Sequence, residues 1–224
     1  MTQVKICCIA SIEEANLAIK YGASAIGLVS EMPSGPGVIS EETIKEIAEQ
    51  TPPSISTFLL TSKQNVDEII EQHHRCGTNT IQLCDKIITG SHLQLKKALP
   101  RIKIVQVIHV TNDESINEAI ETSNLVDAIL LDSGNQKLVT KELGGTGRTH
   151  DWSISRKIVE SVKIPVYLAG GLNPQNVVEA ILQVKPYGVD ICSGVRTNSK
   201  LDEEKLKLFF DRVKSVNKLL AVDK

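Results

Sequence analysis

The chain has 224 residues, of which 41% are hydrophobic, 23% are charged and 3% are aromatic, and its formal net charge is −2. This composition is typical of an ordinary globular protein with enough apolar residues for a large core. The near-neutral charge and the few aromatic rings argue against a nucleic-acid partner and against attraction to an anionic membrane.

Short apolar runs alternate with amphipathic helical patterns along the whole chain. The predicted strands are residues 4–8, 25–29, 54–60, 80–83, 103–110, 127–131, 165–169 and 188–191. The predicted helices are residues 11–21, 40–50, 65–76, 91–99, 113–122, 152–162, 173–184 and 202–220. The first helix shows the clearest boundaries, because Ser11 with Glu14 forms a capping-box pattern and Gly22 follows the last turn.

Eight strand-then-helix units follow one another without a break. Such runs form parallel sheets buried on both faces, and eight units in this length predict an α/β fold with a single (β/α)8 TIM barrel, one domain over residues 1–224. The rival is a doubly wound open sheet, which has a Gly-x-Gly-x-x-Gly turn after its first strand. Residues 7–11 contain no glycine, so the barrel is favoured.

The five cysteines are scattered along the chain, and their number is odd. They are Cys7, Cys8, Cys76, Cys84 and Cys192. This pattern does not resemble a disulfide framework, and it indicates a reducing, cytoplasmic environment. No apolar run approaches the ~20 residues of a membrane span, and the first nine residues are too short and too polar for a signal peptide.

Residues 144–152 read Gly-Gly-Thr-Gly-Arg-Thr-His-Asp-Trp. Glycines allow backbone N–H groups to approach an anion closely, and Arg148 adds a positive charge suited to phosphate. Asp151 is a candidate N-cap of the following helix. The spacing is not that of a P-loop, and a plain glycine-rich surface turn is an equal alternative from these residues alone.

In a (β/α)8 barrel the active site lies at the carboxyl ends of the strands. The turns Gly170-Gly171 and Ser193-Gly194 follow the seventh and eighth predicted strands, where barrels often bind phosphate through backbone N–H groups. Two such turns favour phosphate binding over the simpler interpretation that each only reverses the chain tightly.

Cys7 and Asp132 end the first and sixth predicted strands. Across the mouth of a barrel they could act as a general base and a general acid. A cation on the same strand face, Lys5, would favour the thiolate, and desolvation would raise the pKa of the carboxyl. The alternatives are a small buried hydrophobic residue for Cys7 and a cap of the following turn for Asp132.

A zinc site formed by Cys7, Cys84, His109 and Asp132 is an alternative to this pair. Their spacings match no compact metal motif, so no metal is expected. The remaining histidines, all expected to face solvent, are His73, His74 and His92.

Several motifs together carry a family resemblance. They are Val4-Lys5-Ile6-Cys7, Gln82-Leu83, Leu130-Leu131-Asp132-Ser133, residues 144–152, Leu168-Ala169-Gly170-Gly171-Leu172 with Pro174 and Asn176, residues 186–190, and Ser193-Gly194-Val195. Over nearly its whole length the chain resembles the phosphoribosylanthranilate isomerase family of tryptophan biosynthesis, whose members are cofactor-free barrels.

The resemblance implies an Amadori rearrangement of an aminoaldose phosphate to an aminoketose phosphate, with Cys7 as general base and Asp132 as general acid. It implies a small phosphorylated sugar as the substrate, no cofactor, no metal, no nucleic-acid or membrane partner, a monomer or homodimer, and a cytoplasmic location. The candidate substrate- and phosphate-binding residues are Gly145, Gly147, Arg148, Gly170, Gly171, Ser193 and Gly194.

The sequence departs from the family pattern around the expected pocket. Cys8 replaces a glycine, Cys84-Asp85 replace a histidine and a glycine, His150 replaces a phenylalanine, and Arg196 replaces a usual glutamate. The loop at residues 32–38 lacks the arginine that contacts the anthranilate carboxylate in the family. The possible substrate-side residues are Lys5, Gly37, Cys84, His150 and Arg196.

Loss of a bidentate carboxylate clamp costs a few kcal/mol unless another cation, with Arg148 and Arg196 as the candidates, replaces it. Two alternatives to the isomerase therefore stay open. One is a paralogue that isomerises a different phosphorylated sugar or aminosugar. The other, weaker, is a binding module without catalysis.

Overall fold

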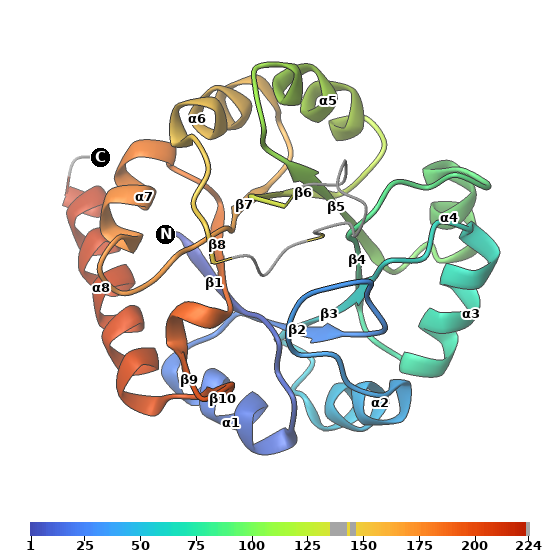
Figure 1. Cartoon of the computed structure of the whole chain (residues 1–224), viewed down its shortest axis with the longest axis horizontal. Coiled ribbons are helices and arrows are strands. Elements are labelled where there is room, and N and C mark those ends of the chain that lie inside the picture. The colour runs from blue at the N-terminus through green and yellow to red at the C-terminus, as the bar shows by residue number, and fades with distance from the viewer. Residues whose placement is uncertain (135–142, 144–146, 223–224) are drawn as a thin grey trace.

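The computed structural model describes residues 1–134, 143 and 147–222, and it forms a closed barrel of eight parallel strands with a helix after each strand (Figure 1). The strands are β1 Gln3–Ile6, β2 Ala25–Val29, β3 Ser56–Thr61, β4 Thr80–Leu83, β5 Lys103–His109, β6 Ala128–Asp132, β7 Val166–Leu168 and β8 Gly188–Ile191. The helices are α1 Ile12–Tyr21, α2 Glu41–Gln50, α3 Val66–Cys76, α4 His92–Ala98, α5 Glu114–Ser123, α6 Trp152–Ser161, α7 Val177–Val184 and α8 Glu203–Val222. The predicted (β/α)8 barrel is confirmed.

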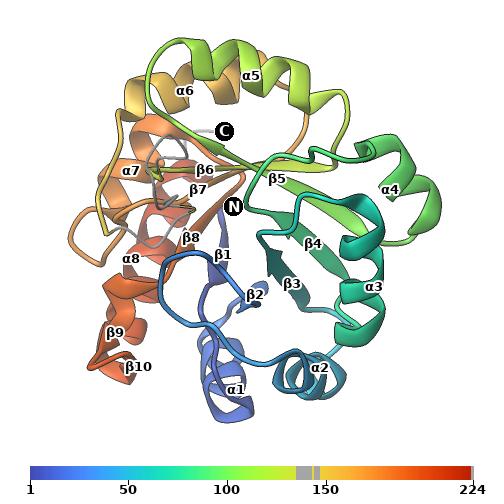
Figure 2. The ribbon, with the colours of Figure 1, turned by 45° about the vertical axis from the view of Figure 1, so that its right-hand side comes forward.

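Pairing between β1 and β8 closes the barrel, with Val4 opposite Val189 and Ile6 opposite Ile191. The strands are buried on both faces, as parallel sheets between helices require. One set of side chains, which includes Phe58, Val105 and Leu130, fills the barrel interior. The alternate set packs between the strands and the outer ring of helices visible in Figure 2. Neighbours two residues apart therefore point to the same face, and this parity decides which side chains reach the barrel mouth.

The local end signals of the helices work as the sequence predicts. The Ser11 side chain accepts a hydrogen bond from the Glu14 N–H at the start of α1, and Gly22 ends that helix with φ 114°. The Asp151 side chain accepts from the Ser153 N–H at the start of α6, so the predicted cap is confirmed. These caps satisfy N–H groups that have no partner within the first turn.

One histidine prediction is wrong. His73 is buried on α3, and its Nε2 lies 2.7 Å from the Thr78 carbonyl oxygen. Burial lowers the pKa of His73, which favours the neutral ring. The helical spacing already carried the signal, because residue 73 falls four positions after Ile69 and three before Cys76 on the inward face.

A short hairpin, β9 Arg196–Thr197 and β10 Lys200–Leu201, was not predicted; it lies beside α1 (Figures 1 and 2). Its two turn residues, Asn198 and Ser199, have φ of 51° and 64°. Such turns usually carry glycine at the second position, so this sequence gives a weak hairpin signal. Among the described helices, none is both long enough and apolar enough to cross a membrane.

Candidate active site

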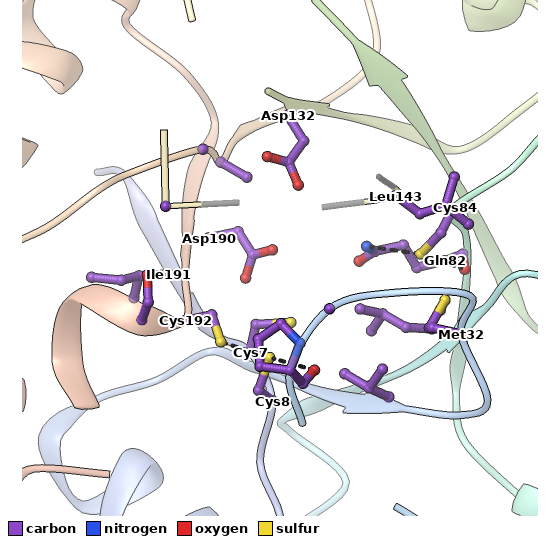
Figure 3. A pocket seen from close by; sticks show the side chains of 18 of the residues that line it. Cys7, Cys8, Met32, Gln82, Cys84, Asp132, Leu143, Asp190, Ile191 and Cys192 are labelled. Carbon is purple, nitrogen blue, oxygen red and sulfur yellow. Dashed lines mark hydrogen bonds between the residues drawn. The ribbon is translucent and has the colours of Figure 1, made fainter. Parts of the chain in front are cut away.

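A pocket opens at the carboxyl ends of the strands and contains about 690 Å³ of space not filled by atoms. Figure 3 shows Asp132 on one side of the pocket, Cys7, Cys8 and Cys192 on the opposite side, and Gln82 beside Cys84 at its flank. Parts of the chain distant in sequence therefore present polar groups to one space, where barrel enzymes place their chemistry.

The predicted pair Cys7 and Asp132 meets across this pocket (Figure 3). Cys7 follows β1, and its backbone N–H donates to the Ile191 carbonyl at 2.8 Å. Asp132 is the last residue of β6 and is 8% exposed. Burial raises the pKa of Asp132 to about 6, against the opposing effect of the Ser133 N–H, which donates to Oδ1 at 2.7 Å. A carboxyl of this kind retains a proton closer to neutrality than an exposed one does.

A buried ion pair lies beneath Cys7. Lys5 Nζ is 2.9 Å from Asp190 Oδ2 and 5.1 Å from the centre of the Phe58 ring. Burial alone would lower the pKa of Lys5, but the Asp190 carboxylate, together with the nearby Cys7 and Cys8, raises it, so the ammonium stays charged. A Cβ at Gly27 would lie 2.8 Å from Cys7 Sγ and 3.0 Å from Lys5 Nζ. The glycine makes room for both groups, and the prediction that they share one strand face is confirmed.

Two polar groups of the pocket were not proposed from the sequence. Gln82 is 3% exposed and Asp190 is 7% exposed, and both line the pocket. Within the described residues, Gln82 Oε1 and Asp190 Oδ1 have no hydrogen-bond partner. Strand parity could have found them, because Gln82 lies two residues before Cys84 and Asp190 lies two before Cys192. Both oxygens can accept hydrogen bonds from a bound molecule.

The glycine-bearing turns come together at one side of the pocket. A Cβ at Gly171 would lie 2.7 Å from the Thr149 nitrogen, and one at Gly194 would lie 2.2 Å from the Leu172 carbonyl oxygen. The turns therefore pack backbone against backbone, which only glycine permits here. The candidate phosphate-binding residues that line the pocket are Gly147, Gly170, Gly171 and Ser193. Gly194 lies behind this lining, and Gly145 lies outside the described residues.

The loop after β2 covers the pocket from the side of Cys8. Met32, Ser34 and Pro36 line the pocket, and a Cβ at Gly37 would lie 2.5 Å from Cys8 Cβ. Gly37 has φ 81°, so the loop approaches Cys8 through a conformation and a distance that favour glycine. No Lys or Arg side chain is present among the described residues that line the pocket.

Cys84 lines the pocket, and burial raises its pKa to about 12, which keeps it a neutral thiol. His150 lies outside the lining; its Nε2 is 2.7 Å from Ser155 Oγ, and burial lowers its pKa to about 4. Arg148 is exposed, and its backbone packs against Gly171.

Arg196 is 7% exposed at its side chain and binds the chain itself. Nη1 donates to Glu14 Oε1 at 2.8 Å, and Nη2 donates to Glu14 Oε2 at 3.0 Å. Nη2 also donates to the Cys8 carbonyl at 2.6 Å and to the Cys7 carbonyl at 3.2 Å. The guanidinium thus joins the start of α1 and the β9 strand to the peptide that carries Cys7.

The four candidate metal ligands do not form a cluster. His109 Nε2 lies 3.3 Å from the Cys84 carbonyl oxygen, whereas Cys7, Cys84 and Asp132 line the pocket. Among the described residues, no three His, Cys, Asp or Glu side chains are arranged to hold a metal ion.

Comparisons with known proteins point to one family. The family model of N-(5'-phosphoribosyl)anthranilate isomerase matches residues 4–212. "N-(5'-phosphoribosyl)anthranilate isomerase 2" of Methanosarcina mazei is 40% identical over 95% of this chain and 94% of its own length. The structure of N-(5'-phosphoribosyl)anthranilate isomerase from Pyrococcus furiosus has 31% identity and a TM-score of 0.79, covering 96% of this chain and 100% of that chain. A crystal structure of a phosphoribosyl anthranilate isomerase in complex with reduced 1-(o-carboxyphenylamino)-1-deoxyribulose 5-phosphate has 28% identity, a TM-score of 0.77 and the same coverage.

Proposed function

The chain belongs to the N-(5'-phosphoribosyl)anthranilate isomerase family, and we propose that it converts phosphoribosylanthranilate, an aminoaldose phosphate, to the corresponding aminoketose phosphate. The observation that carries this proposal is the position of Cys7 and Asp132 on opposite sides of one pocket, with the glycine turns after β7 and β8 beside them. A base, an acid and a phosphate site are the groups that this rearrangement needs.

In this mechanism Asp132 is the general acid. Its protonated carboxyl gives a proton to the ring oxygen of the ribose, and the ring opens to a Schiff base. The raised pKa of Asp132 supports this role, because burial keeps a fraction of the carboxyl protonated near neutral pH. The Ser133 N–H on Oδ1 holds the carboxyl in a fixed orientation and leaves Oδ2 for the substrate.

Cys7 is the general base. Its thiolate removes the proton from the sugar C2 and gives an enolamine. The enolamine becomes the ketone when C1 gains a proton and the C2 hydroxyl loses one. Cys7 has then gained the proton that Asp132 has lost, so exchange with solvent restores both groups. The Lys5 ammonium beneath Cys7 is a cation of the kind that stabilises a thiolate.

The phosphate is proposed to bind at the backbone of Gly171 and of Ser193-Gly194, near Gly147 and Gly170. The backbone-to-backbone packing of these turns supports this assignment, since it presents N–H groups without interfering side chains. Gly145 and Arg148 belong to the same predicted set. The unpartnered oxygens of Gln82 and Asp190 are available for the hydroxyl groups of the sugar.

The carboxylate of the anthranilate ring has no Lys or Arg among the described lining residues to receive it. The loop after β2 contributes Met32, Gly35 and Pro36 to the pocket lining, and its neutral groups are the proposed donors to this carboxylate. A carboxylate held by neutral donors binds less tightly than one clamped by arginine. We therefore expect a high KM for this substrate rather than a different reaction. No cofactor is needed, and a monomer or homodimer in the cytoplasm is the expected state.

The direct test is an assay of the purified chain with phosphoribosylanthranilate, together with rescue of an isomerase-deficient tryptophan auxotroph. The wild type is expected to turn over the substrate and to restore growth, whereas Cys7→Ala and Asp132→Asn are expected to do neither. Cys76→Ser is the matched control, because Cys76 is buried on α3 and does not line the pocket. Folded wild-type protein without turnover on this substrate, but with turnover on another phosphorylated aminosugar, would reassign the substrate.

A further inference from the structure

Two cysteines that the proposed reaction does not use are in contact where β1 and β8 close the barrel. Cys8 follows β1, Cys192 follows β8, and their Sγ atoms are 2.6 Å apart (Figure 3). The distance is well inside the van der Waals separation of two sulfur atoms and about 0.5 Å longer than a disulfide bond. A covalent bond between them therefore requires only a small movement of the side chains.

The backbone on both sides holds this contact in place. Cys8 has φ 61°, a left-handed conformation that is uncommon outside glycine, and Gly37 packs directly on its Cβ. The Cys8 carbonyl accepts a hydrogen bond from Arg196, four residues after Cys192. Pairing between β1 and β8 fixes the distance between the two strand ends that Cys8 and Cys192 follow.

We propose that Cys8 and Cys192 are a redox-active pair that a peroxide oxidises to a disulfide bond beside the active site. Cys192 is the residue of the pair that is partly exposed, and both side chains line the pocket, so a small oxidant has a route to it. Transient disulfides of this kind are compatible with a reducing cytoplasm, where those that do form are usually catalytic or redox-sensing.

The electrostatics of the pair assign the order of attack. The neighbouring Cys8 thiol, followed by the Arg196 guanidinium, lowers the pKa of Cys192 against the effect of burial. The pKa of Cys8 is raised by its contact with Cys192 and by burial. Cys192 is therefore the thiolate that reacts first, and Cys8 is the resolving thiol.

The reaction balances with one molecule of hydrogen peroxide. The Cys192 thiolate attacks one peroxide oxygen, the O–O bond breaks, and Cys192 becomes a sulfenic acid while the departing hydroxide takes a proton to form water. The Cys8 sulfur then attacks the Cys192 sulfur, the S–S bond forms, and the S–O bond breaks. The hydroxide that leaves takes the Cys8 proton as a second water. The two sulfurs together lose two electrons, and the peroxide gains them.

The effect on activity rests on the proposed function. Cys7 precedes Cys8, and Ser193 follows Cys192, so the bond would shift both the proposed base and a proposed phosphate-binding residue. A displacement of about 1 Å in an active site can cost about 100-fold in rate, and the sulfurs must approach by about half of that distance. Oxidation is therefore expected to lower kcat/KM about tenfold, and a thiol reductant should restore it.

The first experiment measures the bond without reference to activity. The purified chain is treated with hydrogen peroxide, and its free thiols are counted after denaturation; the expected count falls from five to three. Mass spectrometry should then show the loss of two hydrogens and a cross-link between the tryptic peptide of residues 6–20 and the one that contains Cys192. Because residues 6–20 also contain Cys7, the cross-link must persist in Cys7→Ser and disappear in Cys8→Gly and Cys192→Ser.

Cys8→Gly suits the left-handed backbone at this position, so its folding is not in question. Cys76→Ser is the matched control: it should form the same cross-link, with its thiol count falling from four to two. The proposal is overturned if peroxide converts the thiols to sulfinic or sulfonic acids without a cross-link, or if the cross-link joins Cys7 to Cys192. A cross-link that leaves kcat/KM unchanged would remove the regulatory effect. Absence of isomerase activity in the reduced chain would instead count against the proposed function, since the cross-link is measured independently.

Discussion

Replacement of Asp132 by asparagine should stabilise the fold at neutral pH and abolish catalysis. Burial raises the pKa of Asp132 in the folded protein from 3.8 to about 6. The folded state therefore binds this proton more tightly than the unfolded state does. Ionisation of Asp132 costs the wild type part of its free energy of unfolding as the pH rises from about 4 to about 6, and this loss persists above pH 6.

The magnitude follows from the size of the shift. A difference of about two pKa units, at about 1.36 kcal/mol per unit, corresponds to at most about 3 kcal/mol. Asparagine has no proton to lose, and its side-chain oxygen can still accept from the Ser133 N–H. The gain in unfolding free energy of Asp132→Asn over the wild type should thus be small near pH 4 and approach about 3 kcal/mol at pH 7.

Urea denaturation of both proteins at pH 4, 5, 6 and 7 measures this difference. Asp211→Asn, an exposed carboxylate on α8, is the matched control and should change the unfolding free energy by no more than about 0.5 kcal/mol at each pH. Two results would refute the view that burial destabilises the ionised form of Asp132. One is a difference in unfolding free energy between Asp132→Asn and the wild type that does not change with pH. The other is a variant that is less stable than the wild type at pH 7.

Substitutions at three further residues test the surroundings of the pocket. Lys5→Met leaves the buried Asp190 carboxylate without its partner and should lower the free energy of unfolding by about 3–5 kcal/mol in chemical denaturation; a loss below about 1 kcal/mol would contradict the ion pair. Gly194→Ala places a Cβ 2.2 Å from the Leu172 carbonyl oxygen and should raise KM for the phosphorylated substrate up to about 100-fold, whereas an unchanged KM would place the phosphate elsewhere. Arg196→Gln releases the loop after β1 and should lower kcat about tenfold or more with a smaller change in KM, and Arg196→Lys should recover part of the loss; equal effects on kcat and KM would indicate a role in binding.

The fold was accessible from the sequence because its signals are local. Continuous apolar runs such as Ala25–Val29 and Thr80–Leu83 have the length and turn boundaries of buried parallel strands, and both predicted ranges agree with the structure. Barrel sites lie at the carboxyl ends of the strands, and this rule predicts that Cys7 and Asp132 lie close together. Both residues line the same pocket. Neither step required knowledge of contacts between distant parts of the chain.

The contacts that surround the pair were not accessible in this way. Lys5 and Asp190 are 185 residues apart in the sequence, and Arg196 lies 182 residues from Glu14. Strand parity indicates that Lys5 and Asp190 both point inward, but their pairing depends on the register between β1 and β8, which no local pattern states. The packing of Gly37 on Cys8 likewise depends on the path of a loop.

Two residues at which the resemblance implies a departure from the family pattern, Cys8 and Arg196, are in contact where β8 meets β1. Cys8 occupies a left-handed position suited to glycine, and Arg196, at a usual glutamate position, donates to the Cys8 carbonyl. A glutamate at position 196 would face the Glu14 carboxylate and the Cys8 carbonyl oxygen. Both groups are hydrogen-bond acceptors, so they would repel a second carboxylate. Arginine at 196 instead holds Glu14 and the peptide of Cys8 together, and it stabilises a thiolate at Cys192. Cys8 and Arg196 therefore act as one unit, and a substitution at either position is expected to alter the same side of the pocket.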